Sequence, residues 1–329
     1  MLTIRQNLLE TIHGGNPDRF VNQYEFLKMI GNTPLNKHNP ATVRGGPPVK
    51  NLWGVTMSWP AHVPGQFPVH DYEHRVVKDI TKWRDTVKAP SVDFPEEEWA
   101  DAIAAAEAID RSEYFVTAMV APGVFEQVHY LLSIEEALVM YAEEPEAMHE
   151  LIDYITDWEV EWAKQLCSHI KPDALFHHDD WGSHISSFLS PAMFDEFITP
   201  AYKKIYGAYK EYGVELIVHH SDSYAANLVP SMIEMGIDIF QGCTTTNNVP
   251  ELVKKYGGKI SFMGDLNNGV CDVENWTPEL IAREVERACR ANGKHYFIPC
   301  LVRGGPGSIY PGVYEEVSKE IDRMSRLLF

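Results

Sequence analysis

The sequence contains few cysteines and an excess of acidic over basic residues, and each feature excludes a class of protein. The five cysteines of the 329-residue chain are scattered, and they form neither a disulfide framework nor a C-x-x-C zinc motif. Lys and Arg together number 28 against 47 Asp and Glu, which gives a formal net charge of −19. This charge argues against nucleic acid or an anionic membrane surface as a partner.

Long apolar runs and the common cofactor motifs are missing as well. No run approaches the roughly 20 apolar residues of a membrane span, and residues 1–5 do not resemble the start of a signal peptide, so we expect a cytoplasmic protein. The sequence has no H-E-x-x-H motif and no G-x-G-x-x-G after its first predicted strand, and its glycine-rich segment 303–307 is not a Walker loop. A metal or cofactor site would therefore have to be assembled from residues distant in the sequence.

A repeated pattern fills the chain from about residue 96 onward, in which a short apolar segment ends abruptly in polar residues and a helical pattern follows. Six such segments predict buried strands, at 114–120, 174–180, 215–219, 237–240, 259–263 and 295–298. We predict an α/β fold in which a parallel sheet closes into a (βα)8 TIM barrel. Residues 1–329 would form a single barrel domain, with 96–329 as its main barrel units.

The N-terminal residues 1–95 are predicted as a helical and aromatic extension of this barrel. Residues 39–70 are rich in Pro, Gly, Trp and His, which is too irregular for a helix and indicates a hairpin with a long loop. Trp53 and Trp59 are therefore candidate substrate-binding residues in a lid over a pocket. The same composition also fits an aromatic cluster that packs the N-terminal segment onto the main body.

Polar side chains follow the predicted strands at the points where these strands end. They are His177, His178, Asp179, Asp180, His219, His220, Asp222, Cys243, Asp265, Asn267 and Cys300. Because the carboxyl ends of the strands meet at one face of a barrel, we expect these side chains to gather around a pocket. Imidazole, thiolate and carboxylate are zinc ligands, and a catalytic zinc takes three of them and keeps one position open. The alternatives are hydrogen-bonded structural histidines, helix-capping aspartates and buried core thiols.

The segment FLSPAMFDEFITPAY at 188–202 resembles the uroporphyrinogen decarboxylase superfamily, and it looks most like the corrinoid-dependent methyltransferase branch. The segments NPDR at 16–19, MGDL at 263–266 and PC at 299–300 fit this resemblance, which covers most of the chain. The resemblance implies a single (βα)8 barrel with its pocket at the carboxyl end of the strands. It also implies a homodimer.

Within that branch, the resemblance implies a zinc site of the form His-x-Cys with a second cysteine near the C-terminus. His219 and Cys300 match the first and last of these positions and are the metal ligands that we expect, with His220 or Asp180 as the third. Ser221 stands where the family has the middle cysteine. A site with fewer thiolates is harder and suits an oxygen-bearing substrate, such as an aromatic methyl ether.

The resulting hypothesis is an O-demethylase-like methyltransferase, which moves a methyl group from a methylated small molecule to the cobalt of a corrinoid (cobalamin) carried by a separate protein. Asp180 and His220 are the candidate catalytic residues. The candidate substrate-binding residues are Trp53, Trp59, His178, Trp181 and Asp265. One alternative is a uroporphyrinogen decarboxylase-like lyase that acts on a carboxylated tetrapyrrole, although the N-terminal region has few arginines for such an anion. Another is a binding barrel without enzymatic activity.

Overall fold

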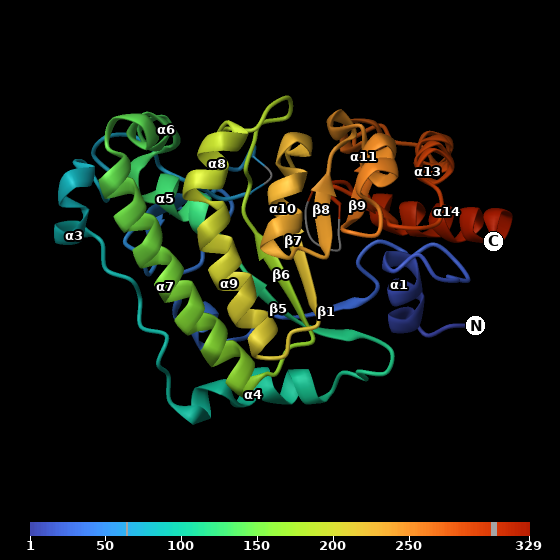
Figure 1. The fold of residues 1–329 in the computed structure, drawn as a ribbon, viewed down its shortest axis with the longest axis horizontal. Helices are drawn as coiled ribbons and strands as arrows, with labels where there is room; N and C mark the ends of the chain where they lie inside the picture. Colours follow the sequence, from blue (N-terminus) through green and yellow to red (C-terminus); the bar gives the residue numbers. More distant parts are fainter. Residues whose placement is uncertain (64, 304–307) are drawn as a thin grey trace.

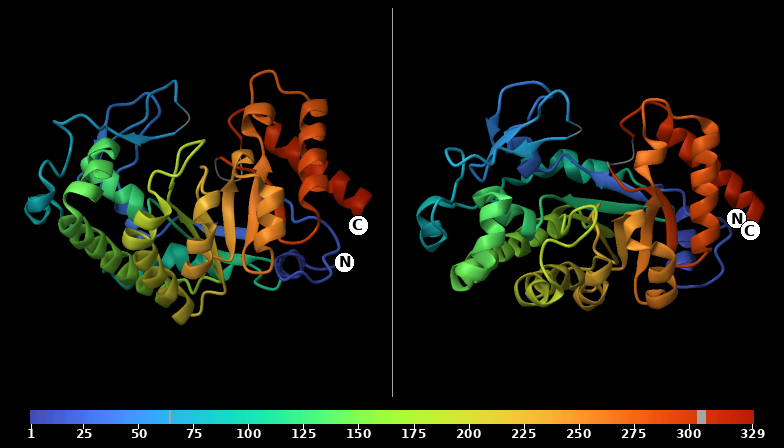
Figure 2. Two further views of the ribbon diagram at one scale, coloured as in Figure 1. Left: turned by 45° about the horizontal axis from the view of Figure 1, so that its top comes forward. Right: turned by 90° about the horizontal axis from the view of Figure 1, so that it is seen from above.

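A computed structural model of the chain describes residues 1–63, 65–303 and 308–329, so the glycine-rich residues 304–307 lie outside the described part. Seven parallel strands form one curled sheet in the order β1-β5-β6-β7-β8-β9-β10 (Figures 1 and 2). A curled parallel sheet with helices around its outer side is the arrangement of a TIM-type barrel. The predicted α/β fold is confirmed, and the described residues contribute seven strands to this sheet where eight were expected.

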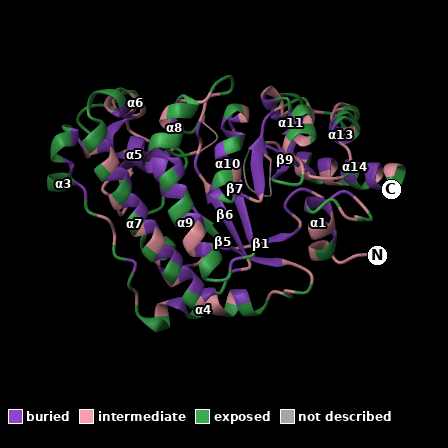
Figure 3. Ribbon diagram, in the orientation of Figure 1, coloured by how far each residue is buried: buried purple, intermediate pink, exposed green. Residues whose placement is uncertain are grey.

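The strands of the curled sheet are short and mostly buried (Figure 3). Their bounds are β1 Leu27–Ile30, β5 Phe115–Val120, β6 Ala174–His178, β7 Leu216–His220, β8 Ile239–Cys243, β9 Ser261–Leu266 and β10 Phe297–Leu301. Each of the six segments expected from the sequence overlaps one of these strands. A parallel strand that is covered on both faces has a continuous run of apolar residues, and such runs are what predicted these strands from the sequence.

Helices surround the sheet and connect its strands (Figure 2). Their bounds are α1 Ile4–Ile12, α2 Pro34–His38, α3 Trp83–Thr86, α4 Glu96–Glu107, α5 Val124–Leu132, α6 Ile134–Glu143, α7 Pro145–His169, α8 Pro191–Phe197, α9 Thr199–Glu211, α10 Val229–Met235, α11 Val249–Tyr256, α12 Asn268–Cys271, α13 Pro278–Asn292 and α14 Val313–Leu328. Ser190 and Thr277 cap α8 and α13 by accepting hydrogen bonds from backbone N–H groups in the first turn. Proline follows each cap in the position that lacks a hydrogen-bond partner in any helix.

The two faces of the curled sheet carry two separate cores, because successive side chains of a strand point to opposite faces. On the inner face, Phe176, Val218 and Met263 pack together, and Leu8 and Ile12 of α1 join this cluster. The neighbouring residues along the strands belong to the outer core, which the surrounding helices share. The helix α1 therefore contributes apolar side chains to the inside of the curl.

The aromatic N-terminal segment forms a small antiparallel sheet of its own, which Figure 2 shows apart from the curled sheet. Its strands are β2 Val49–Lys50, β3 Thr56–Ser58 and β4 Phe67–Pro68. The expected hairpin is thus present. Trp53, in the turn before β3, is buried and packs edge-on against Trp158 of α7, with ring centroids 5.1 Å apart. In the described part of the chain, no helix has the length and apolar character needed to cross a membrane.

Candidate metal centre

Three potential metal ligands converge at the carboxyl ends of β6 and β7. His178 and His220 are the last residues of these strands and are register partners, so both side chains lie on the inner face of the sheet. Their rings stack with centroids 4.4 Å apart. Asp180 follows β6, and one ligand atom from each of His178, Asp180 and His220 lies within 4.8 Å of the others. The described residues contain this single group of three such ligands.

The surrounding side chains orient this His–Asp–His group. The Nε2 atoms of His178 and His220 lie 3.8 and 3.9 Å from the carboxylate oxygens of Asp180. Asp180 also accepts a hydrogen bond of 2.8 Å from the backbone N–H of Asp222. The other nitrogen of His220, Nδ1, is engaged by Gln241 Oε1, and Gln241 Nε2 in turn donates to Tyr24 Oη at 2.8 Å. A hydrogen bond at the remote nitrogen is the usual way to orient an imidazole that binds a metal.

A fourth side chain, the acidic Glu126 of α5, lies beside these three residues, with its Oε2 atom 3.3 Å from His178 Nε2. Burial raises the pKa of Glu126 to about 7. Burial opposes a charge on His178, but the neighbouring carboxylates of Glu126 and Asp180 raise the pKa of this imidazole to about 10. Burial and the His178 charge lower the pKa of His220 to about 4. Two acidic side chains, Glu126 and Asp180, therefore face one imidazole, an environment that favours a cation.

The donor set fits zinc. Two imidazole nitrogens and one carboxylate are a known ligand set of catalytic zinc, which leaves a fourth position for water or substrate. His220 is neutral at pH 7 by its lowered pKa, as a metal ligand must be, whereas His178 would have to release its proton when the metal binds. The same atoms are all compatible with other first-row divalent ions, since imidazole suits several of them.

An open pocket adjoins this group at the mouth of the curled sheet. Loops that follow β6, β7, β8, β9 and β10 line it, and Asp222, Thr244, Asn267 and Arg303 are among its residues. Asp222 links the pocket to the group, because its backbone N–H binds Asp180 while the residue itself lines the pocket. Burial, and next the negative charge of Asp180, raise the pKa of Asp222 to about 7. A pocket at this end of a parallel sheet is where α/β enzymes of this type bind their substrates.

Comparison with known proteins agrees with this architecture. Residues 54–308 match the family described as Uroporphyrinogen decarboxylase (URO-D). The chain belongs to the uroporphyrinogen decarboxylase family. The match covers more than half of the sequence and includes the strands that carry His178 and His220, so the candidate metal centre lies within the family domain.

One solved structure shows the same fold in a distant protein, and a second gives a weaker likeness. A methyltransferase from Methanosarcina mazei aligns with this uroporphyrinogen decarboxylase family member at a TM-score of 0.67 and 12% sequence identity, over 98% of this chain and 99% of that one. A B12-independent methionine synthase from Shewanella sp. W3-18-1 gives a TM-score of 0.48 at 13% identity, over 73% of this chain and 67% of that one. No curated protein matches the sequence. At these identities, the first likeness shows a shared fold alone.

The structure does not bring together the two metal ligands expected from the family resemblance. His219 lies on the outer face of β7, because it is one residue away from the inward-facing His220. Its Nδ1 atom is 2.6 Å from Tyr206 Oη, and its Nε2 atom is 3.2 Å from the carbonyl oxygen of Asp179. Cys300 is buried among the inner core residues, and its thiol donates to the carbonyl oxygen of Leu301 at 3.0 Å. Neither residue joins the group of three ligands within the described residues.

The residues expected to bind substrate are dispersed. Among them, His178 belongs to the metal group. Trp181 is buried and stacks on the ring of His219, with centroids 3.7 Å apart. Asp265 is held by Arg287 Nη1 at 3.1 Å and Asn292 Nδ2 at 2.7 Å, both from α13. Trp53 lines a different cavity beside α7, and the indole N–H of Trp59 donates to the carbonyl oxygen of Val63.

Two contributors to the centre were not expected from the sequence. Glu126 lies on a helix, and no spacing in the sequence relates it to His178. Gln241 lies in the middle of the apolar strand β8. A polar side chain at a buried strand position needs a hydrogen-bond partner, and this was the feature of the sequence that could have indicated a contact with His220.

Asp179 is buried and fixes the start of α5, which carries Glu126. Its carboxylate accepts hydrogen bonds from the backbone N–H groups of Phe125 and Glu126 at 3.0 and 2.7 Å. It also accepts from Trp181 Nε1 at 2.8 Å and from the hydroxyl of Tyr202. Burial raises the pKa of Asp179, while the hydrogen bonds from Tyr202, Glu126 and Trp181 oppose that shift. A carboxylate at the first turn of a helix is further stabilised by the helix dipole.

We expect Asp179→Ala to lower the free energy of unfolding by about 3–5 kcal/mol, because it leaves several buried donors without an acceptor. Urea denaturation followed by circular dichroism measures the loss. The matched control is Asp93→Ala, at an exposed position just before α4, where a change within about 0.5 kcal/mol is expected. Equal losses in the two variants would show that the network around Asp179 contributes little to stability.

Proposed function

We propose that this protein is a methyltransferase that moves a methyl group from a methylated small molecule to the cobalt of a corrinoid protein. The observation that carries the proposal is the inward-facing group of His178, Asp180 and His220, beside an open pocket at the carboxyl end of a uroporphyrinogen decarboxylase family sheet. The structural likeness to the Methanosarcina mazei methyltransferase supports the class of reaction. A cytoplasmic location and a homodimer stay predictions.

We propose His178, Asp180 and His220 as the ligands of a zinc ion, with His220 in the place that the sequence had assigned to His219. When bound, zinc supplies Lewis acidity that polarises an oxygen atom in the substrate. Asp222 and Gln241 hold the ligands in position through Asp180 and His220. A set of nitrogen and oxygen ligands without thiolate is hard, and it supports an oxygen-bearing methyl donor such as a methyl ether.

Glu126 is placed to move a proton during the reaction, since burial raises its pKa to about 7. When the bond between oxygen and the methyl carbon breaks, negative charge develops on the oxygen, and an adjacent proton donor stabilises it. Glu126 Oε2 lies 3.3 Å from His178 Nε2, so a proton on this carboxyl group would stand next to the proposed metal ligands. The open loops above the group leave access for the methyl acceptor, which must approach the methyl carbon from the side opposite the oxygen.

The charge at the pocket argues against the alternative, a decarboxylase acting on a tetrapyrrole with many carboxylates. Such a substrate needs several cationic side chains, since each carboxylate loses its hydration on binding. Among the described residues that line the mouth pocket, Arg303 is the one permanent cation, and Asp222 lies in the same lining. Asp180, which accepts a hydrogen bond from the backbone of Asp222, adds a further acidic side chain next to this lining.

The proposal predicts about one equivalent of zinc per chain in protein never exposed to a chelator, since a catalytic site with three protein ligands holds its metal tightly. His220→Ala should lose most of this zinc, because it removes one of the three ligands. Elemental analysis of the purified variants measures the content. His13→Ala, at an exposed position in the turn after α1, is the matched control and should keep its zinc.

The variant Cys300→Ser separates the proposed ligand set from the one that the family resemblance implies. It should retain zinc if His178, Asp180 and His220 hold the metal. Loss of zinc from Cys300→Ser, together with retention in His220→Ala, would contradict the proposed ligands and favour a site that includes the thiolate.

A second prediction concerns the corrinoid partner, which should dock over the loops at the carboxyl face of the sheet. Ile185, in the loop after β6, is 77% exposed and is an apolar side chain at this face. Ile185→Asp should lower the partner-dependent rate of methyl transfer about tenfold and leave the slow rate with free cob(I)alamin unchanged, because a charge at an interface weakens docking and not chemistry. Val139→Asp, at an exposed position on α6, is the control. An equal effect on both rates would contradict docking at Ile185.

A third prediction concerns the methyl donor. With a competent corrinoid partner, methoxyaromatic compounds should be demethylated, whereas methylamines and methyl thioethers of the same size should react at least about tenfold more slowly, because zinc with hard ligands prefers oxygen. Transfer is followed by the absorbance of methylcobalamin. Faster turnover of a methylated amine or thiol would refute the ether as substrate and leave the metal centre intact as a hypothesis.

A further inference from the structure

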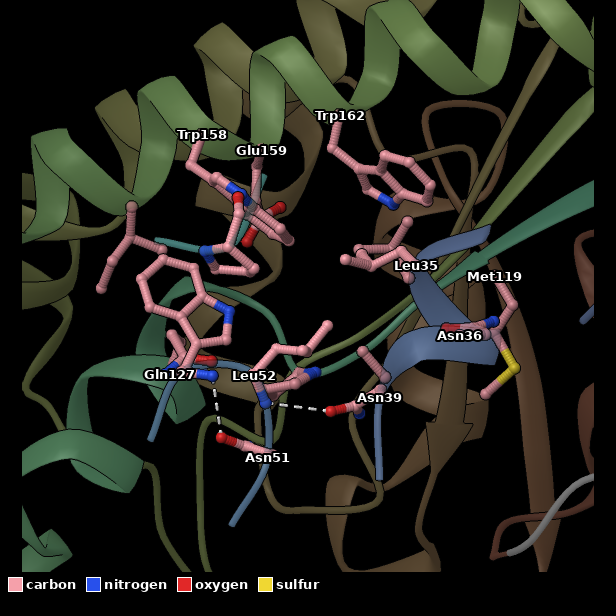
Figure 4. A pocket seen from close by; sticks show the side chains of 16 residues that line it. Leu35, Asn36, Asn39, Asn51, Leu52, Met119, Gln127, Trp158, Glu159 and Trp162 are labelled. Carbon is pink, nitrogen blue, oxygen red and sulfur yellow. Dashed lines mark hydrogen bonds between the residues drawn. The ribbon is translucent and has the colours of Figure 1, made fainter. Parts of the chain in front are cut away.

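A second cavity lies between α7, α2 and the carboxyl end of β5. Figure 4 shows Trp158, Glu159 and Trp162 projecting from α7 toward Leu35 of α2 and Leu52. Among the described residues, this cavity and the pocket at the mouth of the sheet share no lining residue. It is therefore distinct from the proposed metal centre, and what it binds is a separate question.

Two buried polar groups that line this cavity lack hydrogen-bond partners within the described part of the chain. One is the amide nitrogen Nε2 of Gln127, a residue that is 2% exposed, and the other is the carboxylate oxygen Oε1 of Glu159, which is 3% exposed. The second oxygen of Glu159, Oε2, lies 3.0 Å from His177 Nε2, but neither of these two atoms has a hydrogen bond within the described residues, so Oε1 stays open to a ligand. A buried donor and a buried acceptor without partners are unfavourable, and a bound molecule that pairs with both removes that penalty.

The walls of the cavity are aromatic and rigid. Trp53 packs edge-on against Trp158, the indole N–H of Trp158 donates to the carbonyl oxygen of Pro90 at 2.7 Å, and Asn51 Oδ1 accepts from the backbone N–H of Trp53 at 3.0 Å. The cavity volume is about 160 Å³. Apolar cavities of roughly 150 Å³ hold a benzene ring. Indole faces and edges suit another flat ring, since offset and edge-on ring contacts are favourable.

Charge decides which kind of ring compound fits. The described lining contains no Lys, Arg or His, and its one charged residue is Glu159. An anionic ligand would lose its hydration without gaining a cationic partner. A cationic ligand would compete with His177, which already stands against Glu159. The lining therefore favours an uncharged molecule that carries both a donor and an acceptor.

We propose that this cavity binds a small uncharged phenol. A phenolic hydroxyl is both a donor and an acceptor. The hydroxyl hydrogen can donate a hydrogen bond to Glu159 Oε1, and a hydroxyl oxygen can accept one from Gln127 Nε2. One hydroxyl group can make both bonds, or two hydroxyl groups on neighbouring ring carbons can make one each. The ring occupies the space between the tryptophans. This inference does not depend on methyl transfer at the metal centre, and it stands if that proposal fails.

The test is isothermal titration of the full-length protein with phenol, compared with its Gln127→Leu variant. Saturable binding of one phenol is expected, and Gln127→Leu should weaken it about tenfold through loss of one hydrogen bond to a buried group. The same substitution should leave the Tm of the free protein unchanged or raise it, because it removes a buried donor that has no partner. A merely structural glutamine would show the reverse, with a lowered Tm and unchanged binding. Gln165→Leu, in the last part of α7 and outside the cavity lining, is the matched control.

Three further ligands test the chemistry of the cavity. Cyclohexanol keeps the hydroxyl and loses the flat ring, benzoate carries a negative charge, and phenyltrimethylammonium carries a positive charge. Each should bind at least about fivefold more weakly than phenol, and Trp162→Phe should weaken phenol less than Trp162→Ala does. No saturable phenol binding, or tighter binding of phenyltrimethylammonium or benzoate than of phenol, would overturn the proposal.

Discussion

The alternation of side chains along β6 and β7 is the constraint on which the rest of the structure depends. Each strand ends in two adjacent histidines, and the parallel register pairs His177 with His219 and His178 with His220. Because successive residues face opposite sides of the sheet, one pair enters the inside of the curl and the other enters the layer of helices. The inner pair joins Asp180 beside the open pocket, while the outer pair joins Tyr206 of α9 and Glu159 of α7.

The outer pair forms a chain whose protons can be assigned. His219 Nε2 donates a hydrogen bond to the carbonyl oxygen of Asp179, because a carbonyl oxygen can only accept. Burial lowers the pKa of His219 well below its usual range, so the imidazole is neutral and carries a single proton. Its Nδ1 atom therefore accepts a hydrogen bond from the hydroxyl of Tyr206. Tyr206 Oη must then accept from His177 Nδ1 at 2.9 Å. Nε2 of His177 lies 3.0 Å from the Glu159 carboxylate. Through these contacts His177 links Tyr206 of α9 and Glu159 of α7 to the sheet, which is a structural role.

The strands, and the edge of the sheet where the candidate site lies, follow from the sequence, but which of two adjacent histidines faces inward does not. Apolar runs ending in polar residues located six strands and placed histidines and aspartates at their ends. The strand β1 was missed because it has four residues and Lys28 among them, which gives no distinct pattern. The choice of His219 rather than His220 as a metal ligand depended on which of the two adjacent residues faces the inside of the sheet. A shift of one residue along the strand moves every side chain to the opposite face. Glu126 comes from a helix that only the folded chain brings to His178.

The helix α5 lies between the proposed metal centre and the cavity beside α7, and one buried carboxylate holds its first turn. Glu126 faces the metal group and Gln127, its neighbour, lines the cavity beside α7. Both belong to the first turn of α5, and Asp179 holds that turn by accepting the backbone N–H groups of Phe125 and Glu126. Asp179 itself follows His178 in the chain, immediately after β6. The position of Glu126 relative to His178 is therefore set through the buried side chain of Asp179, and the same contacts place Gln127 against the second cavity.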